Sequence, residues 1–146
     1  MQYRRFGSLD WQASALGFGA MRLPTLGNRE TIDEPEAIRM LRYAIDQGVN
    51  YIDTAYPYHG GNSELVVGRA VQDGYRERVH LATKLPVPRV ESADDFDRFL
   101  DEQLEKLGVS YVDFYLFHGL RRPRWETVLQ HDLLARADRA LADGRV

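Results

Sequence analysis

The 146-residue sequence contains no cysteine. This absence excludes disulfide bonds, thiolate nucleophiles and thiolate metal ligands within the chain, and it is compatible with a reducing compartment. The sequence also lacks any run of about 18 apolar residues, the length that a membrane-spanning helix requires. Its charged N-terminal residues are not followed by the apolar core of a signal peptide. We therefore expect a cytoplasmic protein without a membrane partner.

An excess of positive charge is also missing. Lysine and arginine number 19 against 22 aspartate and glutamate residues, which gives a formal net charge of −3. Sequence-independent binding to nucleic acid requires a basic surface for the phosphates, so we expect no nucleic-acid partner. Hydrophobic residues make up 44% and charged residues 28% of the chain, as in ordinary globular proteins. With no linker or low-complexity segment, residues 1–146 are predicted to form one domain.

Hydrophobic patterns predict an N-terminal hairpin followed by four strand–helix units. The hairpin is expected at residues 2–6 and 11–15, on either side of a turn at 7–10. Helices are expected where apolar residues recur every three or four positions and glycine or proline marks an end. The predicted strands are 15–19, the strand that ends at Asp53, 79–84 and 111–118, and the predicted helices are 35–48, 62–74, 92–108 and 125–143, the last with a break near 130–132. Units of roughly 30 residues favour a parallel α/β sheet.

Three of the predicted strands end in an ionisable residue. These residues are Asp53, Lys84 and His118, and Tyr58 follows Asp53 by five positions. Parallel α/β proteins place their ligand sites at the carboxyl ends of the strands, so we expect the four side chains to share one rim. Burying an unpaired carboxylate is costly, and Lys84 is the expected partner of Asp53.

The same residues suit the reduction of a carbonyl group. A phenol has an unperturbed pKa of about 10 and is a weak acid near neutral pH. A neighbouring ammonium stabilises a phenolate, lowers the pKa of the phenol and makes it a proton donor for a developing alkoxide. We therefore expect Tyr58 to donate the proton and His118 to orient the carbonyl oxygen. No side chain supplies hydride, so this chemistry implies a nicotinamide cofactor.

Each of the four residues also has an ordinary structural interpretation. Asp53 could be a turn residue, Lys84 a solvated side chain, Tyr58 a packed aromatic and His118 a hydrogen-bonded structural group. These separate interpretations do not predict that all four fall at corresponding positions of successive units. The conjunction favours a functional site.

Two other candidate sites are weaker. His59, His118 and Asp53 lack the compact spacing of a metal site, and Lys84 beside them would repel a cation, so we predict no metal. The segment 121–124, Arg-Arg-Pro-Arg, has enough charge to hold a phosphate but is more typical of a solvated loop.

At these residues the chain resembles the aldo-keto reductases, in particular the branch whose longer members carry a ferredoxin-like iron–sulfur segment after the barrel. The five-residue step from Asp53 to Tyr58 is specific, and the four residues together are a strong signal. The matching segments run in order along nearly the whole chain: LGFGAMRLP at 16–24, YIDTAYPY at 51–58, NSE at 62–64, ATK at 82–84 and LFHG at 116–119.

This resemblance implies a (β/α)8 barrel that reduces small aldehydes or ketones with NADPH or NADH. It implies Tyr58 as the acid, Lys84 and Asp53 as the groups that tune it, and His118 as an aid to substrate orientation. It further implies that the backbone around Ala20 and Met21, together with Asp53, lies beside the nicotinamide ribose, and that the hairpin plugs the bottom of the barrel. An iron–sulfur cluster is implied only for longer relatives.

The chain differs from the family in length. A (β/α)8 barrel needs about 250 residues, so we expect only the first four βα units, as a half-barrel with an N-terminal hairpin. Such a half-barrel exposes its edge strands and one side of its interior, which favours self-association or a complementing C-terminal half. We also expect the isolated chain to bind NADPH weakly or not at all.

Three functions remain open from the sequence. The first is a carbonyl reductase completed by further βα units. The second is a catalytically silent half-barrel that serves as an interaction or assembly module. The third is a metal-dependent hydrolase on a barrel.

Overall fold

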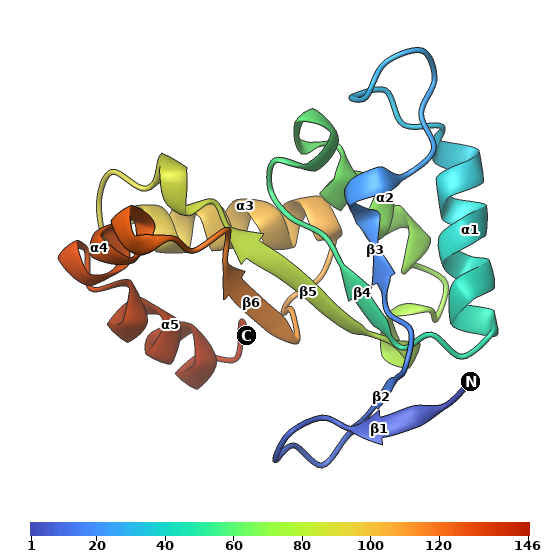
Figure 1. Cartoon of the computed structure of the whole chain (residues 1–146), viewed down its shortest axis with the longest axis horizontal. Coiled ribbons are helices and arrows are strands. Elements are labelled where there is room, and N and C mark those ends of the chain that lie inside the picture. The colour runs from blue at the N-terminus through green and yellow to red at the C-terminus, as the bar shows by residue number, and fades with distance from the viewer.

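The computed structural model describes all residues from 1 to 146. A hairpin, a parallel sheet and five α-helices follow one another along the chain (Figure 1). The strands are β1 (Tyr3–Arg5), β2 (Gln12–Ser14), β3 (Phe18–Gly19), β4 (Tyr51–Asp53), β5 (His80–Leu85) and β6 (Phe114–Phe117). The helices are α1 (Glu34–Asp46), α2 (Ser63–Ala70), α3 (Asp95–Leu107), α4 (Arg122–Gln130) and α5 (Leu133–Ala142).

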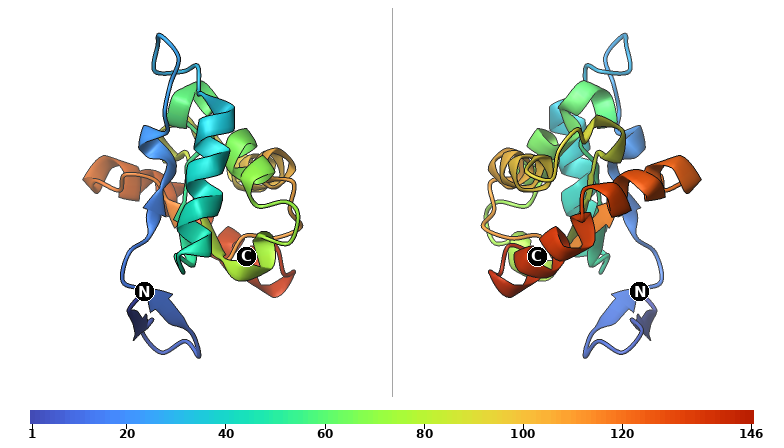
Figure 2. Two further views of the ribbon diagram at one scale, coloured as in Figure 1. Left: turned by 90° about the vertical axis from the view of Figure 1, so that its right-hand side faces the viewer. Right: turned by 90° about the vertical axis from the view of Figure 1, so that its left-hand side faces the viewer.

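The sheet has the winding of half a (β/α)8 barrel. Its four strands are parallel and lie in sequence order, β3-β4-β5-β6. Helices α1, α2 and α3 connect successive strands and cover one face of the sheet (Figure 2). A consecutive strand order with the helices on one face is the geometry that closes into a barrel when more units are added. The predicted fold class is therefore confirmed.

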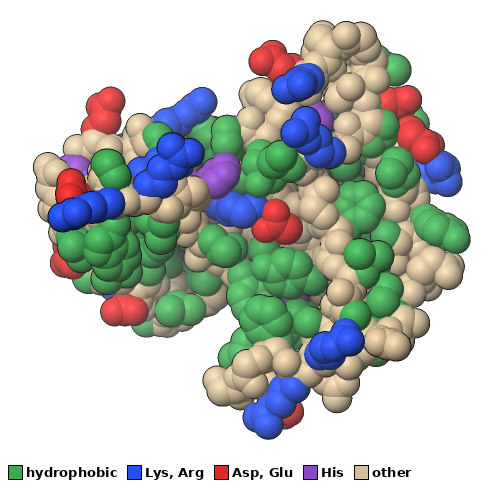
Figure 3. Space-filling view, viewed as in Figure 1, with side chains coloured by type: hydrophobic (Ala, Val, Ile, Leu, Met, Phe, Trp, Pro, Cys, Tyr) green, Lys and Arg blue, Asp and Glu red, His purple; other side chains and the backbone are tan.

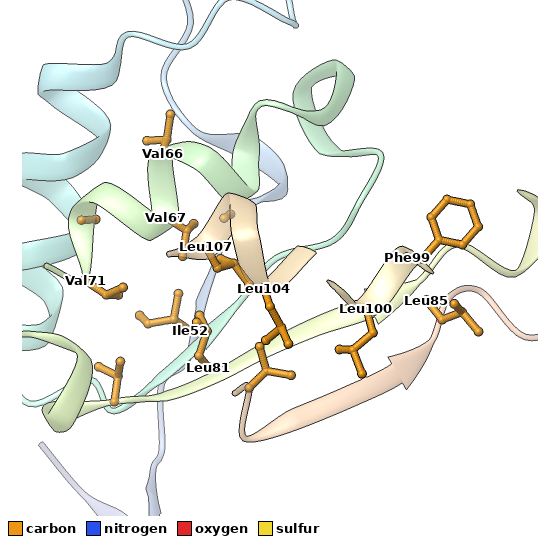
Figure 4. Packing of buried hydrophobic residues seen from close by; sticks show 14 of the residues in the cluster. Ile52, Val66, Val67, Val71, Leu81, Leu85, Phe99, Leu100, Leu104 and Leu107 are labelled. Carbon is orange, nitrogen blue, oxygen red and sulfur yellow. The ribbon is translucent and has the colours of Figure 1, made fainter. Parts of the chain in front are cut away.

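The core fills the space between the sheet and its helices. Every third or fourth residue of α3 faces inward, and Leu100 and Leu107 are fully buried in the same hydrophobic cluster as Ile52 and Leu81 (Figure 4). Burying one such side chain stabilises the fold by about 1.5–3 kcal/mol. Helix α2 approaches α3 closely because Gly68 has no side chain: a Cβ there would lie 2.6 Å from the carbonyl oxygen of Leu107.

The opposite face of the sheet, which we call the inner face, has no helix over it. Leu116 of β6 points to this side and is 40% exposed. Hydrophobic side chains gather on this face of the molecule in the space-filling view (Figure 3). The open interior that was expected of a half-barrel is therefore present.

The hairpin covers the lower end of the inner face. Five rings from the hairpin and three strands form an aromatic group, which we call the hairpin cluster: Phe6, Trp11, Tyr51, His80 and Phe114. The ring centroids of Trp11 and His80 lie 3.9 Å apart, and those of Phe6 and Phe114 lie 5.2 Å apart. The hairpin thus contacts β6, at the far edge of the sheet from β3.

Several local predictions were wrong in detail. Helix α2 ends at Ala70 rather than near Gly74, and neither Asn62 nor Ser63 caps its first turn through a side chain. Helix α4 begins at Arg122, so the segment 121–124 is the start of a helix and not a loop. Pro123 explains this difference, because proline is well suited to the first turn of a helix. Strand β3 has two residues rather than five, and β6 has four residues rather than the eight predicted over 111–118.

The break predicted near residues 130–132 is present between α4 and α5. Asp132 there adopts a left-handed conformation, with φ of 50°. No helix is both long and apolar enough to cross a membrane.

Candidate active site

The carboxyl ends of β4 and β5 bring Asp53, Lys84 and Tyr58 together. The Lys84 ammonium donates to the Asp53 carboxylate at 2.7 Å, to the Thr54 carbonyl oxygen at 2.7 Å and to the Tyr58 hydroxyl at 3.3 Å. Its three N–H bonds therefore each have a partner. The Lys84 side chain is only 14% exposed, and the predicted pairing with Asp53 is confirmed.

His118 completes the group from the end of β6. Its ring stands edge-on to that of Tyr58, with centroids 5.7 Å apart and planes at 85°. Its recorded hydrogen bonds involve only the backbone: its N–H donates to the Leu85 carbonyl, and its carbonyl accepts from Arg124. Partial burial, together with the charges of Lys84 and Arg124, lowers the pKa of His118 below its usual 6.5. The neutral imidazole is therefore favoured near neutral pH.

A tight turn fixes the position of Tyr58. The backbone N–H of Tyr58 donates to the Ala55 carbonyl, and the next residue, His59, adopts a left-handed conformation with φ of 52°. His59 is held on both sides: its Nε2 accepts from the Leu23 N–H at 3.2 Å, and its Nδ1 lies 2.6 Å from the Arg29 carbonyl oxygen. Since Nε2 accepts, Nδ1 is the donor. Both nitrogens of His59 are thus committed within the protein.

A buried polar network lies directly behind Lys84, on the helix side of the sheet. Thr83 donates to Glu64 Oε1 at 2.6 Å, and Gln103 donates to the same oxygen and to the Lys84 carbonyl. The Tyr115 hydroxyl donates to Gln103 at 2.8 Å. Glu64 is fully buried, its Oε2 has no hydrogen-bond partner, and burial raises the pKa of its carboxyl group. This network ties the end of β5 to α2 and α3.

A cavity of about 550 Å³ opens beside Tyr58. Met21, Arg22, Arg29 and Pro57 are among its lining residues. Because the Tyr58 hydroxyl accepts its hydrogen bond from Lys84, its own hydrogen is available to a molecule in this region. The site therefore presents an available proton donor next to this cavity, although Asp53, Lys84 and His118 do not line it.

The residues predicted to contact the cofactor differ in how accessible they are. Met21 is 49% exposed and lines the cavity. Asp53 pairs with Gly19 at the end of β4 and its side chain is 29% exposed, so both residues are accessible to a ribose. Ala20 is fully buried, and its carbonyl oxygen already accepts from the Ser63 hydroxyl at 3.1 Å. Ala20 therefore has no surface exposed to a ligand. Gly19 before it has open space where a side chain would lie. Of the predicted contacts, Met21 and Asp53 fit one edge of a nicotinamide ribose.

Comparison with known proteins assigns the family. The model of the Aldo/keto reductase family matches residues 15–127, more than half of the chain. The chain belongs to the aldo/keto reductase family. Two curated relatives are a probable aldo-keto reductase 1 from Glycine max, 32% identical over 78% of this chain, and a 6-dehydroglucose reductase from Novosphingobium aromaticivorans, 31% identical over 99% of this chain.

Solved aldo-keto reductases share the fold. A thermostable member in complex with the inhibitor epalrestat superposes on 98% of this chain with a TM-score of 0.79 and 32% identity. A Klebsiella pneumoniae member in complex with NADPH covers 92% of this chain with a TM-score of 0.72 and 28% identity. The aldo-keto reductase chain described here spans 35% and 49% of the two curated relatives, and 51% and 43% of these two structures.

Sequence reasoning identified the four rim residues but missed those that support them. The structure brings Asp53, Tyr58, Lys84 and His118 together as expected. The sequence contains no pattern that indicates the supporting role of His59. Gln103 did carry a signal, because it interrupts the apolar row of α3 between Leu100 and Leu104.

Proposed function

We propose that this chain supplies the proton-donating side of an NADPH- or NADH-dependent carbonyl reductase. The observation that carries the proposal is the Lys84 ammonium, which contacts both Asp53 and the Tyr58 oxygen. As Tyr58 gives its proton to a carbonyl oxygen, negative charge develops on the phenol oxygen 3.3 Å from this ammonium. A preorganised positive charge at that point stabilises the transition state more than the ground state.

Asp53 and His118 have complementary roles in this proposal. Asp53 holds the ammonium in place and balances its charge, so that Lys84 stays fixed between Asp53 and Tyr58. The His118 ring has no hydrogen-bond partner within the chain, and its neutral form is favoured. Its ring N–H is then available to orient the carbonyl oxygen toward Tyr58.

The cofactor would lie on the other side of the carbonyl group. Met21 and Asp53 are the groups of this chain that would hold the nicotinamide ribose. The nicotinamide supplies the hydride when it is bound. Support for this cofactor comes from the family and from the Klebsiella pneumoniae member solved with NADPH.

The proposal is tested by carbonyl-dependent NADPH oxidation with Tyr58→Phe. General acid catalysis contributes about 10²–10⁴-fold, so the rate should fall by that factor. Tyr43→Phe removes the same hydroxyl from a tyrosine that is 62% exposed on α1, and its rate should equal that of the unmodified chain. An unchanged rate in Tyr58→Phe would show that Tyr58 is not the acid.

The same assay separates the carbonyl reductase from a catalytically silent half-barrel. NADPH is titrated first, because we expect weak binding, and turnover is then measured at the highest cofactor concentration reached. Oxidation that does not depend on added aldehyde would favour the silent half-barrel.

A further inference from the structure

A second cavity, of about 440 Å³, lies beside His118. Pro57 lines both this cavity and the one next to Tyr58, so the two adjoin at the rim. Its charged lining residues are Arg89, Arg121 and Arg124, and no carboxylate lines it. We call this cavity the arginine pocket. A cavity with this lining is unusual in a chain whose formal net charge is −3.

The three arginines of the pocket lack ion-pair partners within the protein. Arg136 and Arg145 on the outer helical surface show the contrast, because each contacts at least two aspartates. In the pocket, Arg89 lies over the ring of Tyr56 at 5.1 Å from its centroid, and Arg124 donates to the Gly119 carbonyl at 2.6 Å. No carboxylate of the chain lies within 4.0 Å of these three guanidinium groups. Their charge is therefore available to a ligand.

The walls of the pocket are stiff. Three prolines, Pro57, Pro86 and Pro88, contribute to the lining. Gly119 has a left-handed φ of 59°, and a Cβ there would lie 2.4 Å from a guanidinium nitrogen of Arg124. The glycine thus permits the approach of Arg124 to the backbone. A preformed site of this kind loses little conformational entropy when a ligand binds.

The start of α4 adds to the positive potential. Arg121 precedes the first turn of this helix, the turn contains no acidic residue, and no side chain caps it. The N-terminal end of a helix carries partial positive charge, and its unpaired N–H groups can donate to an anion. The helix dipole and the arginines therefore both make the electrostatic potential of the arginine pocket more positive.

We propose that the arginine pocket binds an anionic group of the substrate, a carboxylate or a phosphate, while the substrate's carbonyl lies between Tyr58 and His118. Guanidinium groups recognise both anions through paired N–H donors. This inference rests on the proposed function and adds to it a substrate class: small aldehydes or ketones that carry a negative charge. His118 lines the pocket and its ring centroid lies 5.7 Å from that of Tyr58, so one molecule can reach both the arginines and the proton donor.

Binding is tested first, without turnover. Inorganic phosphate is titrated into the full chain, at constant ionic strength set with sodium chloride, and amide shifts are followed by NMR. Saturable shifts should map to Arg89, Gly119 and the residues at the start of α4. Arg121→Gln should weaken this binding by roughly three- to tenfold. Arg139→Gln, which removes the same charge from an exposed position outside the pocket lining on α5, should leave it unchanged.

Substrate preference is tested with matched aldehydes. The kcat/KM for 4-formylbenzoate should exceed that for 4-methylbenzaldehyde by roughly tenfold, and Arg121→Gln should remove most of this preference through KM. Glyceraldehyde 3-phosphate against glyceraldehyde makes the same comparison for a phosphate group. Whichever pair shows the larger preference identifies the anion.

The outcomes separate this inference from the proposed function. Turnover of neutral and anionic aldehydes at equal kcat/KM, with no effect of Arg121→Gln, would overturn the anion site and leave the reductase standing. Localised phosphate binding that depends on Arg121 in a chain without turnover would support the anion site and count against the reductase. Phosphate shifts that are absent, or that are the same in Arg121→Gln, would overturn the anion site.

Discussion

Neighbouring residues of strand β5 face opposite sides of the sheet and make different kinds of contacts. Thr83 faces the helices and enters a sealed network with Glu64 and Gln103. Lys84, the next residue, faces the inner side and holds Asp53 and the Tyr58 hydroxyl at an accessible rim. Alternation along a strand is what separates them. On the helix side, the polar groups bond to one another and stabilise the fold. On the inner face, the Tyr58 hydroxyl still has a hydrogen available to a ligand.

The largest expected effect is on stability and compares two leucines. Leu85 is fully buried on the helix side, whereas Leu116 is 40% exposed on the inner face. Leu85→Ala should lower the free energy of unfolding by about 2–5 kcal/mol, because it creates a cavity in a packed core. Leu116→Ala should lower it by less than about 1 kcal/mol. Urea denaturation followed by circular dichroism measures both, and equal losses would show that the inner face is packed as tightly as the core.

The next effect compares Thr83 with Lys84 directly. Thr83→Val removes a hydroxyl that bonds the buried Glu64 carboxyl, and it should lower the free energy of unfolding by about 1–3 kcal/mol. Lys84→Met should reduce carbonyl-dependent NADPH oxidation by roughly 10²-fold or more, because no ammonium then stabilises the charge on Tyr58.

Measuring stability and turnover for both variants sharpens the comparison. Thr83→Val is expected to act mainly on unfolding and Lys84→Met mainly on kcat. A Lys84→Met variant with full kcat would show that the Lys84 ammonium on the inner face does not contribute to catalysis.

A smaller effect concerns the pH dependence of stability. Burial raises the pKa of the Glu64 carboxyl group above its ordinary value of 4.5 in the folded protein. The unfolded chain therefore releases this proton at lower pH, and the stability contributed by protonated Glu64 is present below about pH 4.5 and is lost as the pH rises toward the folded pKa. Glu64→Gln should remove this decline, which is at most about 1.4 kcal/mol per pH unit. Unfolding free energies of the two chains that run parallel between pH 4.5 and 8 would contradict the raised pKa.

The smallest expected effect is on the titration of His118. Its folded pKa lies below 6.5 because of burial first, then the charges of Lys84 and Arg124. Its neutral form should therefore contribute stability above pH 6.5 that is lost as the pH falls through the folded pKa. Arg124→Gln should raise the pKa of His118 by a few tenths of a unit, as measured by NMR of the imidazole ring. Arg139→Gln serves as the control with the same loss of charge.

The order of the elements was predictable because it depends on local patterns. Apolar spacing in α3 and the glycine at its end, Gly108, are sufficient to place that helix. The rim was predictable because strands of one sheet end at the same side, which brings Asp53 and Lys84 together without knowledge of side-chain positions. Both inferences need only neighbouring residues and one rule of topology.

The supporting network and the arginine pocket were not predictable in this way. Glu64 and Gln103 are 39 residues apart, and the depth to which each is buried depends on how α2 and α3 pack. The segment 121–124 was expected to be a loop, and only its folding into the start of α4 places Arg121 and Arg124 on one cavity. Long-range packing decides both cases.

The hairpin cluster has a consequence for the order of folding. Phe6 comes from the first residues of the chain, yet its ring contacts Phe114 on the last strand of the sheet. Contacts between residues so distant in sequence carry a large loop-closure entropy and form slowly. The hairpin can therefore dock fully only after β6 has joined the sheet. Trp11 belongs to the same cluster and its ring lies against His80. In a Trp125→Phe variant, which removes the other tryptophan of the chain, tryptophan fluorescence should report this final step separately from the earlier formation of helices.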